Sequence, residues 1–293
     1  MTKTELNFTW IEVMPYLFVL LWSTGFIVAR YGMPLSPPFK FLELRYICSI
    51  LCFLPWIFLA KVPWPTERKQ WLHLGVTGTL IQAGYLGGVW VGVKSGIGSG
   101  LTALIMGLQP VLTAFWLSSR QHLITKRQWL GLWLGLSGVL LVVSHKLSEG
   151  IEVNLPGFTA ELIALLSITA GTLYQKQFVK SCDVRTANTV QLMASALVSL
   201  PLAGLEIEQI QWSAQFFYSL AWSVLGLTLG AGSLFYLLIQ RGAASQVTSL
   251  LYLVPPTTAV MAWILFGEAI TLMTLLGVAL TVMGVWLVVK TQK

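Results

Sequence analysis

The sequence predicts an all-α integral membrane protein with ten transmembrane helices, arranged as two inverted five-helix repeats. Three observations predict this fold class. The chain is 56% hydrophobic and only 10% charged, it contains ten apolar runs of membrane-crossing length, and its second half repeats its first. Lipid offers the backbone no hydrogen-bond partners, and the runs lack the alternating pattern of barrel strands. Each run is therefore predicted to be a helix.

The internal repeat sets the domain organisation. Residues 102–143 match residues 248–289 at a constant offset of 146 positions, and no gap is needed. Because this offset is half of the chain length, we expect two copies of one unit, residues 1–147 and 148–293.

The ten predicted helices follow in order along the chain. They are expected at about residues 13–33, 38–60, 70–93, 97–118, 127–146, 157–180, 186–205, 213–240, 243–266 and 270–290. Each run holds roughly 20 residues, enough at about 1.5 Å per residue to cross a hydrocarbon layer roughly 30 Å thick. The polar residues before the first run lack the pattern of a cleaved signal peptide, so we expect them to remain in the protein.

The distribution of Lys and Arg predicts the orientation. With the N-terminus in the cytoplasm, 13 of these residues fall on the cytoplasmic side and 4 on the other side. Both termini are then cytoplasmic. An odd number of helices per copy makes the second copy enter from the opposite face, an arrangement typical of secondary transporters. Duplication for stability alone is the alternative.

Charge and metal-ligating residues argue against other classes of protein. The net charge of +7 comes from short basic clusters between apolar runs, so no nucleic-acid partner is expected. The three cysteines and three histidines show no metal-ligand spacing, so we expect neither a metal nor a cofactor. A membrane enzyme, which should gather acids, bases or metal ligands near one interface, is a distant alternative.

Prolines mark candidate hinges in the fourth and ninth helices. Pro110 and the pair Pro255 and Pro256 lie near mid-depth, where a missing N–H weakens the helical ladder. Pro110 and Pro256 are 146 positions apart, so both copies carry the break at one position. We interpret it as a functional kink.

Polar and aromatic residues near mid-membrane are the candidate substrate-binding residues. Polar groups at that depth are costly unless they face protein or a water-filled cavity. Hydroxyl groups can instead bond to their own helix, whereas Gln amides need several partners and favour the cavity. Aromatic rings would suit a cargo with an apolar part. The candidates are Trp22, Ser23, Thr24, Gln82, Tyr85, Gln109, Thr169 and Tyr252.

Charged residues inside or near the spans are candidates for gating. One hypothesis is that Arg45 or Arg30 forms an ion pair with Glu161 and closes an outer gate. Alternatively, Arg45 holds a substrate carboxylate through two hydrogen bonds. Further candidates for the mouths of the cavity are Lys176, Trp90, Tyr174 and Tyr236.

Four stretches of the chain resemble the EamA branch of the drug/metabolite transporter superfamily. They are LLWSTGFIVARYG (20–32), ELRY (43–46), LTALIMGLQPVLTAF (101–115) and LVPPTTAVMAWILFGEAIT (253–271). The resemblance implies a bacterial cytoplasmic-membrane carrier, usually an exporter of amino acids or small metabolites. It also implies a central cavity lined mainly by helices 1, 3, 4, 6, 8 and 9. The first copy departs from the pattern, with Gln121 and His122 where the family commonly has Gly-Glu.

The predicted function is therefore efflux of a small metabolite by alternating access about a midplane cavity. We expect a small-molecule substrate, the lipid bilayer as surroundings and a monomer or weak dimer. No nucleotide-binding P-loop is present. Proton coupling, exchange and facilitated diffusion stay open, because the intramembrane acids Glu43 and Glu161 lie toward one face. A lipid-linked substrate carrier or flippase is the nearer alternative function.

Overall fold

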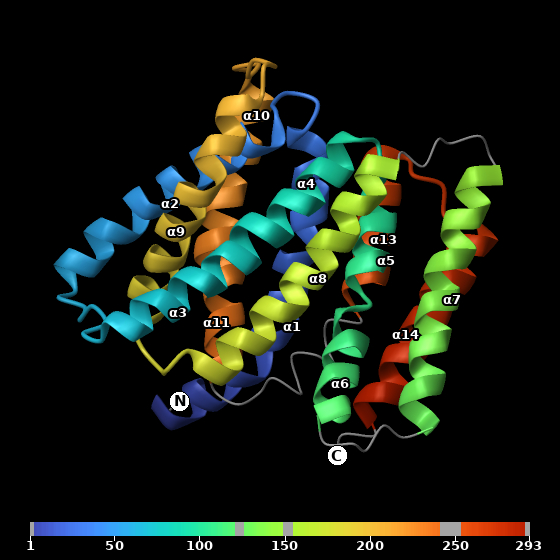
Figure 1. The fold of residues 1–293 in the computed structure, drawn as a ribbon, viewed down its shortest axis with the longest axis horizontal. Helices are drawn as coiled ribbons and strands as arrows, with labels where there is room; N and C mark the ends of the chain where they lie inside the picture. Colours follow the sequence, from blue (N-terminus) through green and yellow to red (C-terminus); the bar gives the residue numbers. More distant parts are fainter. Residues whose placement is uncertain (1–2, 121–125, 149–154, 241–252, 291–293) are drawn as a thin grey trace.

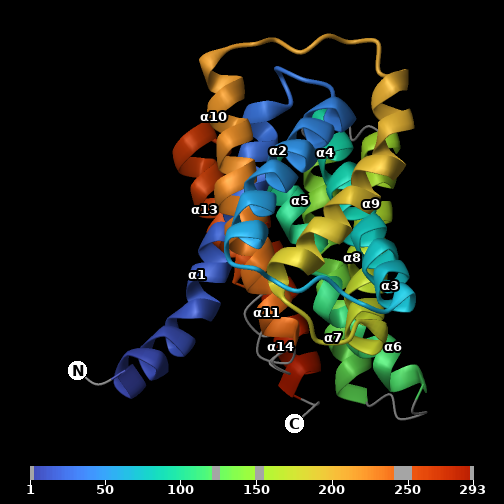
Figure 2. The ribbon, with the colours of Figure 1, turned by 90° about the vertical axis from the view of Figure 1, so that its left-hand side faces the viewer.

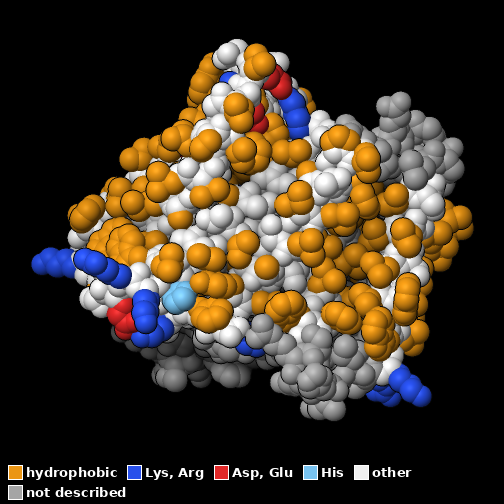
Figure 3. All heavy atoms as spheres, in the orientation of Figure 1, with side chains coloured by type: hydrophobic (Ala, Val, Ile, Leu, Met, Phe, Trp, Pro, Cys, Tyr) orange, Lys and Arg blue, Asp and Glu red, His pale blue; other side chains and the backbone are white. Residues whose placement is uncertain are grey.

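The computed structural model describes residues 3–120, 126–148, 155–240 and 253–290, and all of its regular structure there is helical. Five helical segments are long and apolar enough to cross a membrane, and five shorter apolar helices accompany them. These are the ten helices that the apolar runs predict, which confirms the fold class. Figure 3 shows hydrophobic side chains spread over a broad face of the molecule, with Lys and Arg near its edges, as lipid contact requires.

The helices of the first half are, in order, α1 (Lys3–Gly32), α2 (Pro38–Leu59), a third made of α3 (Arg68–Gly78), η1 (Thr79–Leu86) and α4 (Gly87–Lys94), a fourth made of α5 (Ser99–Met106) and α6 (Gln109–Arg120), and α7 (Lys126–Ser148). Those of the second half are α8 (Leu155–Phe178), α9 (Val184–Leu205), an eighth made of α10 (Ala214–Trp222), η2 (Ser223–Gly232) and α11 (Ser233–Gln240), α13 (Val254–Phe266) and α14 (Leu272–Lys290).

The two halves run in opposite directions through the bundle. In Figures 1 and 2, α1 begins at the end of the bundle where α14 finishes, whereas α8 begins at the opposite end. We call the end where α1 begins the near end and the opposite one the far end. Equivalent helices of the two halves pair with each other, α2 with α9 and α7 with α14. The repeats are therefore inverted and interlocked.

Glycines let these helices approach to backbone contact. In the α7–α14 pair, a Cβ atom added to Gly138 would lie 2.5 Å from the carbonyl oxygen of Gly277. On the third helix, a Cβ added to Gly88 would lie 2.4 Å from the carbonyl oxygen of Ala160 in α8. Contacts this close leave no room for a side chain, so glycine sets these helix spacings.

Both central helices contain a π-helical segment at the same place in the repeat. η1 ends at Leu86 and η2 at Gly232, positions that are 146 residues apart. The hydrogen bonds of a π-helix join residues five apart, one more than in an α-helix. A π-helical segment therefore redirects side chains, and such segments are common at functional sites. The 3.6-residue apolar pattern of the sequence did not predict these segments.

The proline-marked breaks lie next to each other. The fourth helix is interrupted at Gly107 and Leu108, so Pro110 lies in the first turn of α6, where its missing N–H removes no helical hydrogen bond. Pro255 and Pro256 lie likewise in the first turn of α13. A Cβ added to Gly107 would be 2.8 Å from Cγ of Pro255. The equivalent breaks of the two repeats therefore touch inside the bundle.

Candidate functional site

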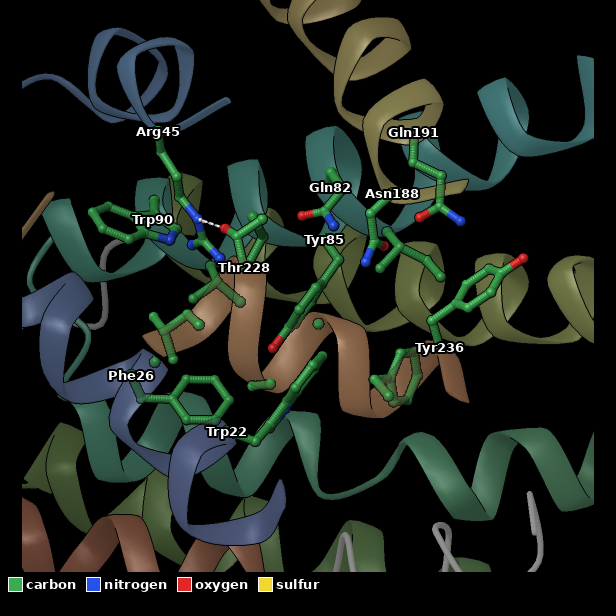
Figure 4. Close-up of a pocket in the computed structure, with 18 of the residues that line it drawn as sticks. Trp22, Phe26, Arg45, Gln82, Tyr85, Trp90, Asn188, Gln191, Thr228 and Tyr236 are labelled. Atoms are coloured by element: carbon green, nitrogen blue, oxygen red, sulfur yellow. Dashed lines mark hydrogen bonds between the residues drawn. The ribbon is translucent and has the colours of Figure 1, made fainter. Parts of the chain in front are cut away.

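The main cavity lies inside the bundle, between the two π-helical segments and next to α1, α2, α8 and α9 (Figure 4). Its volume is about 50 Å³. That is room for a few waters. In this conformation the cavity is narrow, so it must widen before it can hold a metabolite.

Two equivalent sets of positions form opposite walls of this cavity. Six residues of the third helix and six residues of the eighth line it, and each member of the first set is 146 positions from its counterpart in the second. The first set is Ile81, Gln82, Tyr85, Leu86, Val89 and Trp90, and the second is Leu227, Thr228, Ala231, Gly232, Phe235 and Tyr236. The cavity is therefore built across the pseudo-two-fold axis.

Arg45 and Gln191 form a further equivalent pair, on α2 and α9. The side chains are 4% and 3% exposed, and Figure 4 shows them at opposite ends of the cavity with Gln82 and Tyr85 between them. Neither Nη1 of Arg45 nor Nε2 of Gln191 has a hydrogen-bond partner in the described part of the chain. Both repeats thus present an unused nitrogen donor at the same position.

The π-helical geometry of η2 orients Arg45. The Thr228 hydroxyl donates to the carbonyl oxygen of Ser223, five residues earlier, at 3.0 Å. Since a hydroxyl has one hydrogen, the Thr228 oxygen is left to accept the bond that Arg45 Nε donates at 2.9 Å. This contact anchors the guanidinium by Nε and leaves its outer nitrogens available.

Aromatic rings form the wall on the side of α1. Trp22 and Tyr85 are stacked, with ring centroids 6.1 Å apart and an interplanar angle of 3°. Phe235 lies against Trp22 at 5.0 Å between centroids. Rings in this arrangement give a wide apolar surface for the body of a ligand.

The structure brings together some of the predicted binding residues. Trp22, Gln82 and Tyr85 line the cavity, together with Arg45, Trp90 and Tyr236, which the sequence suggested for gating. Gln109 lines a smaller adjoining cavity that shares Trp22 and Tyr85 with the main one, and its Nε2 donates to Thr172 at 3.1 Å. Tyr252 lies outside the described residues.

The three predicted hydroxyl residues do not line these two cavities. Ser23 donates to the carbonyl oxygen of Val19 at 2.7 Å, Thr24 to that of Leu21 at 2.6 Å and Thr169 to that of Leu165 at 2.7 Å. All three therefore bond to their own helices, which is the alternative that hydroxyl groups allow in apolar surroundings.

Among the described residues, Glu161 forms no ion pair with Arg45 or Arg30, so the predicted gate pair is wrong. Glu161 instead contacts residues of α4 and α5. Its Oε1 accepts from the hydroxyl of Thr102 at 2.7 Å, and the side chain packs against Gly92. Arg30 pairs instead with Glu268, in the connection after α13. Glu161 points from α8 toward α4 and α5, whereas Arg45 faces η2, so these two charges do not meet.

At the far end, Glu268 joins the two repeats. Besides pairing with Arg30, its Oε1 accepts from the backbone N–H of Ser99 at 3.2 Å and from the Ser99 hydroxyl at 3.0 Å. Glu208, also in the second repeat, pairs with Lys94 at 2.7 Å. Polar contacts therefore connect the two repeats at this end.

Another set of contacts joins the repeats at the near end. Lys180 pairs with Glu67 at 2.7 Å. Nε2 of Gln70 donates to the carbonyl oxygen of Lys180 at 2.7 Å, and Oε1 of Gln70 accepts from the Lys180 N–H at 3.1 Å. The hydrogen bond from Lys180 lowers the pKa of Glu67. Tyr174 lies 2.8 Å from His73 Nδ1, and Lys176 is exposed on the surface.

Sequence reasoning missed Gln175, Asn188, Gln191 and Thr228, which all line the cavity. The signal that could have found two of them is the repeat itself: the offset of 146 carries Gln82 onto Thr228 and Arg45 onto Gln191. The second and seventh helices also contribute to the main cavity. The described residues of the fourth and ninth helices, the latter from residue 253 onward, line only the adjoining one. This differs from the lining that the family resemblance implies.

A model of the EamA-like transporter family matches residues 9–144 and, a second time, residues 155–290. The chain belongs to the EamA-like transporter family. It is a multi-pass membrane transporter and not an enzyme. The two matches cover the two halves that form the opposite walls of the cavity, so each EamA unit supplies one wall.

Several relatives span nearly the whole chain. An "Uncharacterized transporter YvbV" of Bacillus subtilis is 28% identical, over 92% of this chain and 88% of its own length. A "Probable amino-acid metabolite efflux pump" of Salmonella typhimurium is 26% identical, over 92% of both chains. An "Uncharacterized inner membrane transporter YedA" of Escherichia coli is 22% identical, over 92% of this chain and 87% of its own.

One solved crystal structure has the same fold. It superposes with a TM-score of 0.68 at 17% sequence identity, and the match covers 94% of this chain and 96% of the other. At this identity the likeness concerns the fold alone.

Proposed function

We propose that this EamA-family protein is a secondary transporter that exports a small metabolite by alternating access. The observation that carries the proposal is the cavity wall: six positions of one repeat face the six equivalent positions of the inverted repeat. A site with this symmetry can open to either end by exchanging the conformations of its two halves. We place the boundary between the halves after residue 147.

The contacts at the two ends of the bundle support two gates. Arg30 and Glu268 connect the repeats at the far end, and Glu67 and Lys180 connect them at the near end. Breaking one set while keeping the other would give the cavity access to one aqueous phase. The touching breaks at Gly107 and Pro255 lie between the gates and are the proposed hinge.

We assign the near end to the cytoplasm. The excess of Lys and Arg in the connections that lie there supports this orientation, with both termini cytoplasmic in a bacterial inner membrane. Two relatives support efflux as the direction of transport. They are named probable amino-acid metabolite efflux pumps, come from Salmonella typhimurium and Escherichia coli, and are each 26% identical to this chain. Amino acids or their metabolites are the corresponding class of cargo.

A metabolite comparison tests the proposal. Cells that produce the protein and cells that lack it are grown on the same medium, and small molecules in the medium are quantified. We expect at least one compound to accumulate outside the producing cells, and the same compound to leave proteoliposomes that contain the purified protein. Equal profiles in both strains under varied nutrient loads would count against export.

A groove between α6 and α8 favours a second candidate, transport of a lipid-linked substrate. Nine of its eleven lining residues are aliphatic or aromatic, including Leu112, Phe115 and Leu166, and it shares no residue with the main cavity. A groove of this kind could hold an acyl chain. Transbilayer movement of a fluorescent lipid-linked sugar in proteoliposomes, without movement of water-soluble metabolites, would favour this candidate over the first.

A further inference from the structure

The described residues that line the main cavity carry a single formal charge. Arg45 is the one ionisable Asp, Glu, Lys or Arg among the described residues that line it, and its side chain is 4% exposed. Its Nε bonds to Thr228, while Nη1 has no partner in the described residues. A buried guanidinium without a counter-charge is strongly unfavourable. An anion from outside the protein would supply the missing counter-charge.

The opposite end of the cavity is polar but neutral. Gln191 occupies the position on α9 that Arg45 occupies on α2, and Asn188 lies one turn before it. Figure 4 shows both amides on the side away from Arg45. Nε2 of Gln191 lacks a partner in the described residues. Amides donate and accept hydrogen bonds without carrying charge, so this end suits a neutral polar group.

Among the residues that the structure describes, no carboxylate lines the cavity to balance a cationic group. Asp and Glu are absent from its described lining, and the sequence of residues 241–252, outside the described part, contains neither. Two buried acids lie near the cavity, but neither lines it. Oε1 of Glu161 accepts from the Thr102 hydroxyl, and Glu43 lies two residues from Arg45 on α2, outside the lining. An ammonium group brought into this cavity would lose its hydration and gain no opposite charge.

We propose that the cargo is a small organic monoanion rather than a zwitterionic amino acid. Its carboxylate binds Arg45 through the outer guanidinium nitrogens, its apolar body lies along Trp22 and Tyr85, and a neutral hydrogen-bonding group reaches Gln191 and Asn188. One cation balances one negative charge, so a dianion fits less well. The inference rests on the proposed transport function and narrows its cargo to carboxylates whose amino group, if present, is blocked.

Three compounds with one body and different charges test the proposal. N-acetyl-L-phenylalanine is a monoanion at pH 7, L-phenylalanine a zwitterion and L-phenylalaninamide a cation. Binding to the purified full chain in nanodiscs is measured by quenching of tryptophan fluorescence. We expect the N-acetyl compound to bind at least tenfold more tightly than the zwitterion, and the cation to bind least. Equal affinities, or tighter binding of the zwitterion, would overturn the proposal, as would failure of all three to bind.

The pseudo-symmetry offers a charge-relocation control. Arg45→Gln makes the two equivalent positions identical and neutral, so the preference for the anion should fall at least tenfold. Adding Gln191→Arg to Arg45→Gln restores one cation, at the equivalent position, and should recover part of the preference. The double variant keeps the composition of the native pair, so it separates loss of charge from poor folding. A preference for the anion that survives in Arg45→Gln would contradict the assigned role.

Transport is scored separately from binding. Efflux of the N-acetyl compound from proteoliposomes is compared in chloride and in sulfate buffers of equal ionic strength. Equal efflux in both supports an organic cargo, and loss of efflux in chloride would show that an inorganic counter-ion occupies Arg45. Selective binding of the anion without efflux would leave the cavity assignment standing and refute the transport proposal. Efflux that favours the zwitterion would refute the cavity assignment and leave the transport proposal standing.

Discussion

The far-end contact between Arg30 and Glu268 gives the sharpest test of gating. Glu268→Gln removes the charge but keeps an oxygen that can accept from the N–H and hydroxyl of Ser99. The side chains are 37% and 18% exposed, so solvent weakens the pair, and we take its contribution as about 1 kcal/mol, at the upper end of the range for exposed pairs. A change of that size raises the ratio of open to closed far ends about fivefold.

Cysteine accessibility measures this ratio. The native cysteines are replaced by serine, Ala231 in the cavity wall is changed to cysteine, and a membrane-impermeant maleimide is added from the far side. When opening is fast compared with labelling, the labelling rate follows the open population. We expect the rate to rise about fivefold in Glu268→Gln.

Glu208→Gln is the matched control. It removes an ion pair with Lys94 at the same end, but these side chains are 28% and 48% exposed, and Lys94 retains its bond to the carbonyl oxygen of Met33. Its expected effect is below twofold, because a more solvated pair contributes less. An unchanged or slower labelling rate in Glu268→Gln, or an equal rise in both variants, would refute the reasoning.

Three further predictions concern packing, binding and pH. In Gly88→Ala, the new Cβ would lie 2.4 Å from the carbonyl oxygen of Ala160, so α8 must move away. We expect the free energy of unfolding to fall by about 1–3 kcal/mol, measured as a lower Tm in detergent. Trp22→Ala removes an apolar wall and should weaken binding of an aromatic cargo by about tenfold in the fluorescence assay. Lys180 lowers the pKa of Glu67 below its ordinary value of 4.5. The Glu67–Lys180 contact is therefore fully present above that value and is lost as the pH falls through the lowered pKa, which near-end cysteine labelling at graded pH would detect.

The sequence predicted the helices and the repeat well because hydrophobic runs and a fixed offset are directly visible in it. Depth in the membrane could also be inferred from the sequence, and it selected Trp22, Gln82 and Tyr85, which line the cavity. Depth does not give rotation about the helix axis, however. Trp22 and Ser23 lie at nearly the same depth but point about 100° apart, and one lines the cavity while the other bonds to Val19.

The remaining errors have two physical causes. The π-helical segments change the side-chain register by a fraction of a turn, and nothing in the apolar pattern marks them. Pairing of charges depends on which neighbour a side chain faces, and the sequence does not show this. Arg30 therefore pairs with Glu268, whereas a pair with Glu161 was the hypothesis. In contrast, Gln191 and Thr228 could have been predicted from the sequence. The repeat offset of 146 positions maps Arg45 onto Gln191 and Gln82 onto Thr228.

Locking each end of the bundle in turn is the most direct test of one cavity served by two gates. Cysteines at positions 30 and 268, or at 67 and 180, are joined by a short bifunctional thiol reagent, and a maleimide-reactive cysteine at position 231 reports access from each side in oriented vesicles. We predict that linking the far end leaves position 231 reachable only from the near side, and that linking the near end does the opposite. Access from the same side in both linked forms would contradict the account.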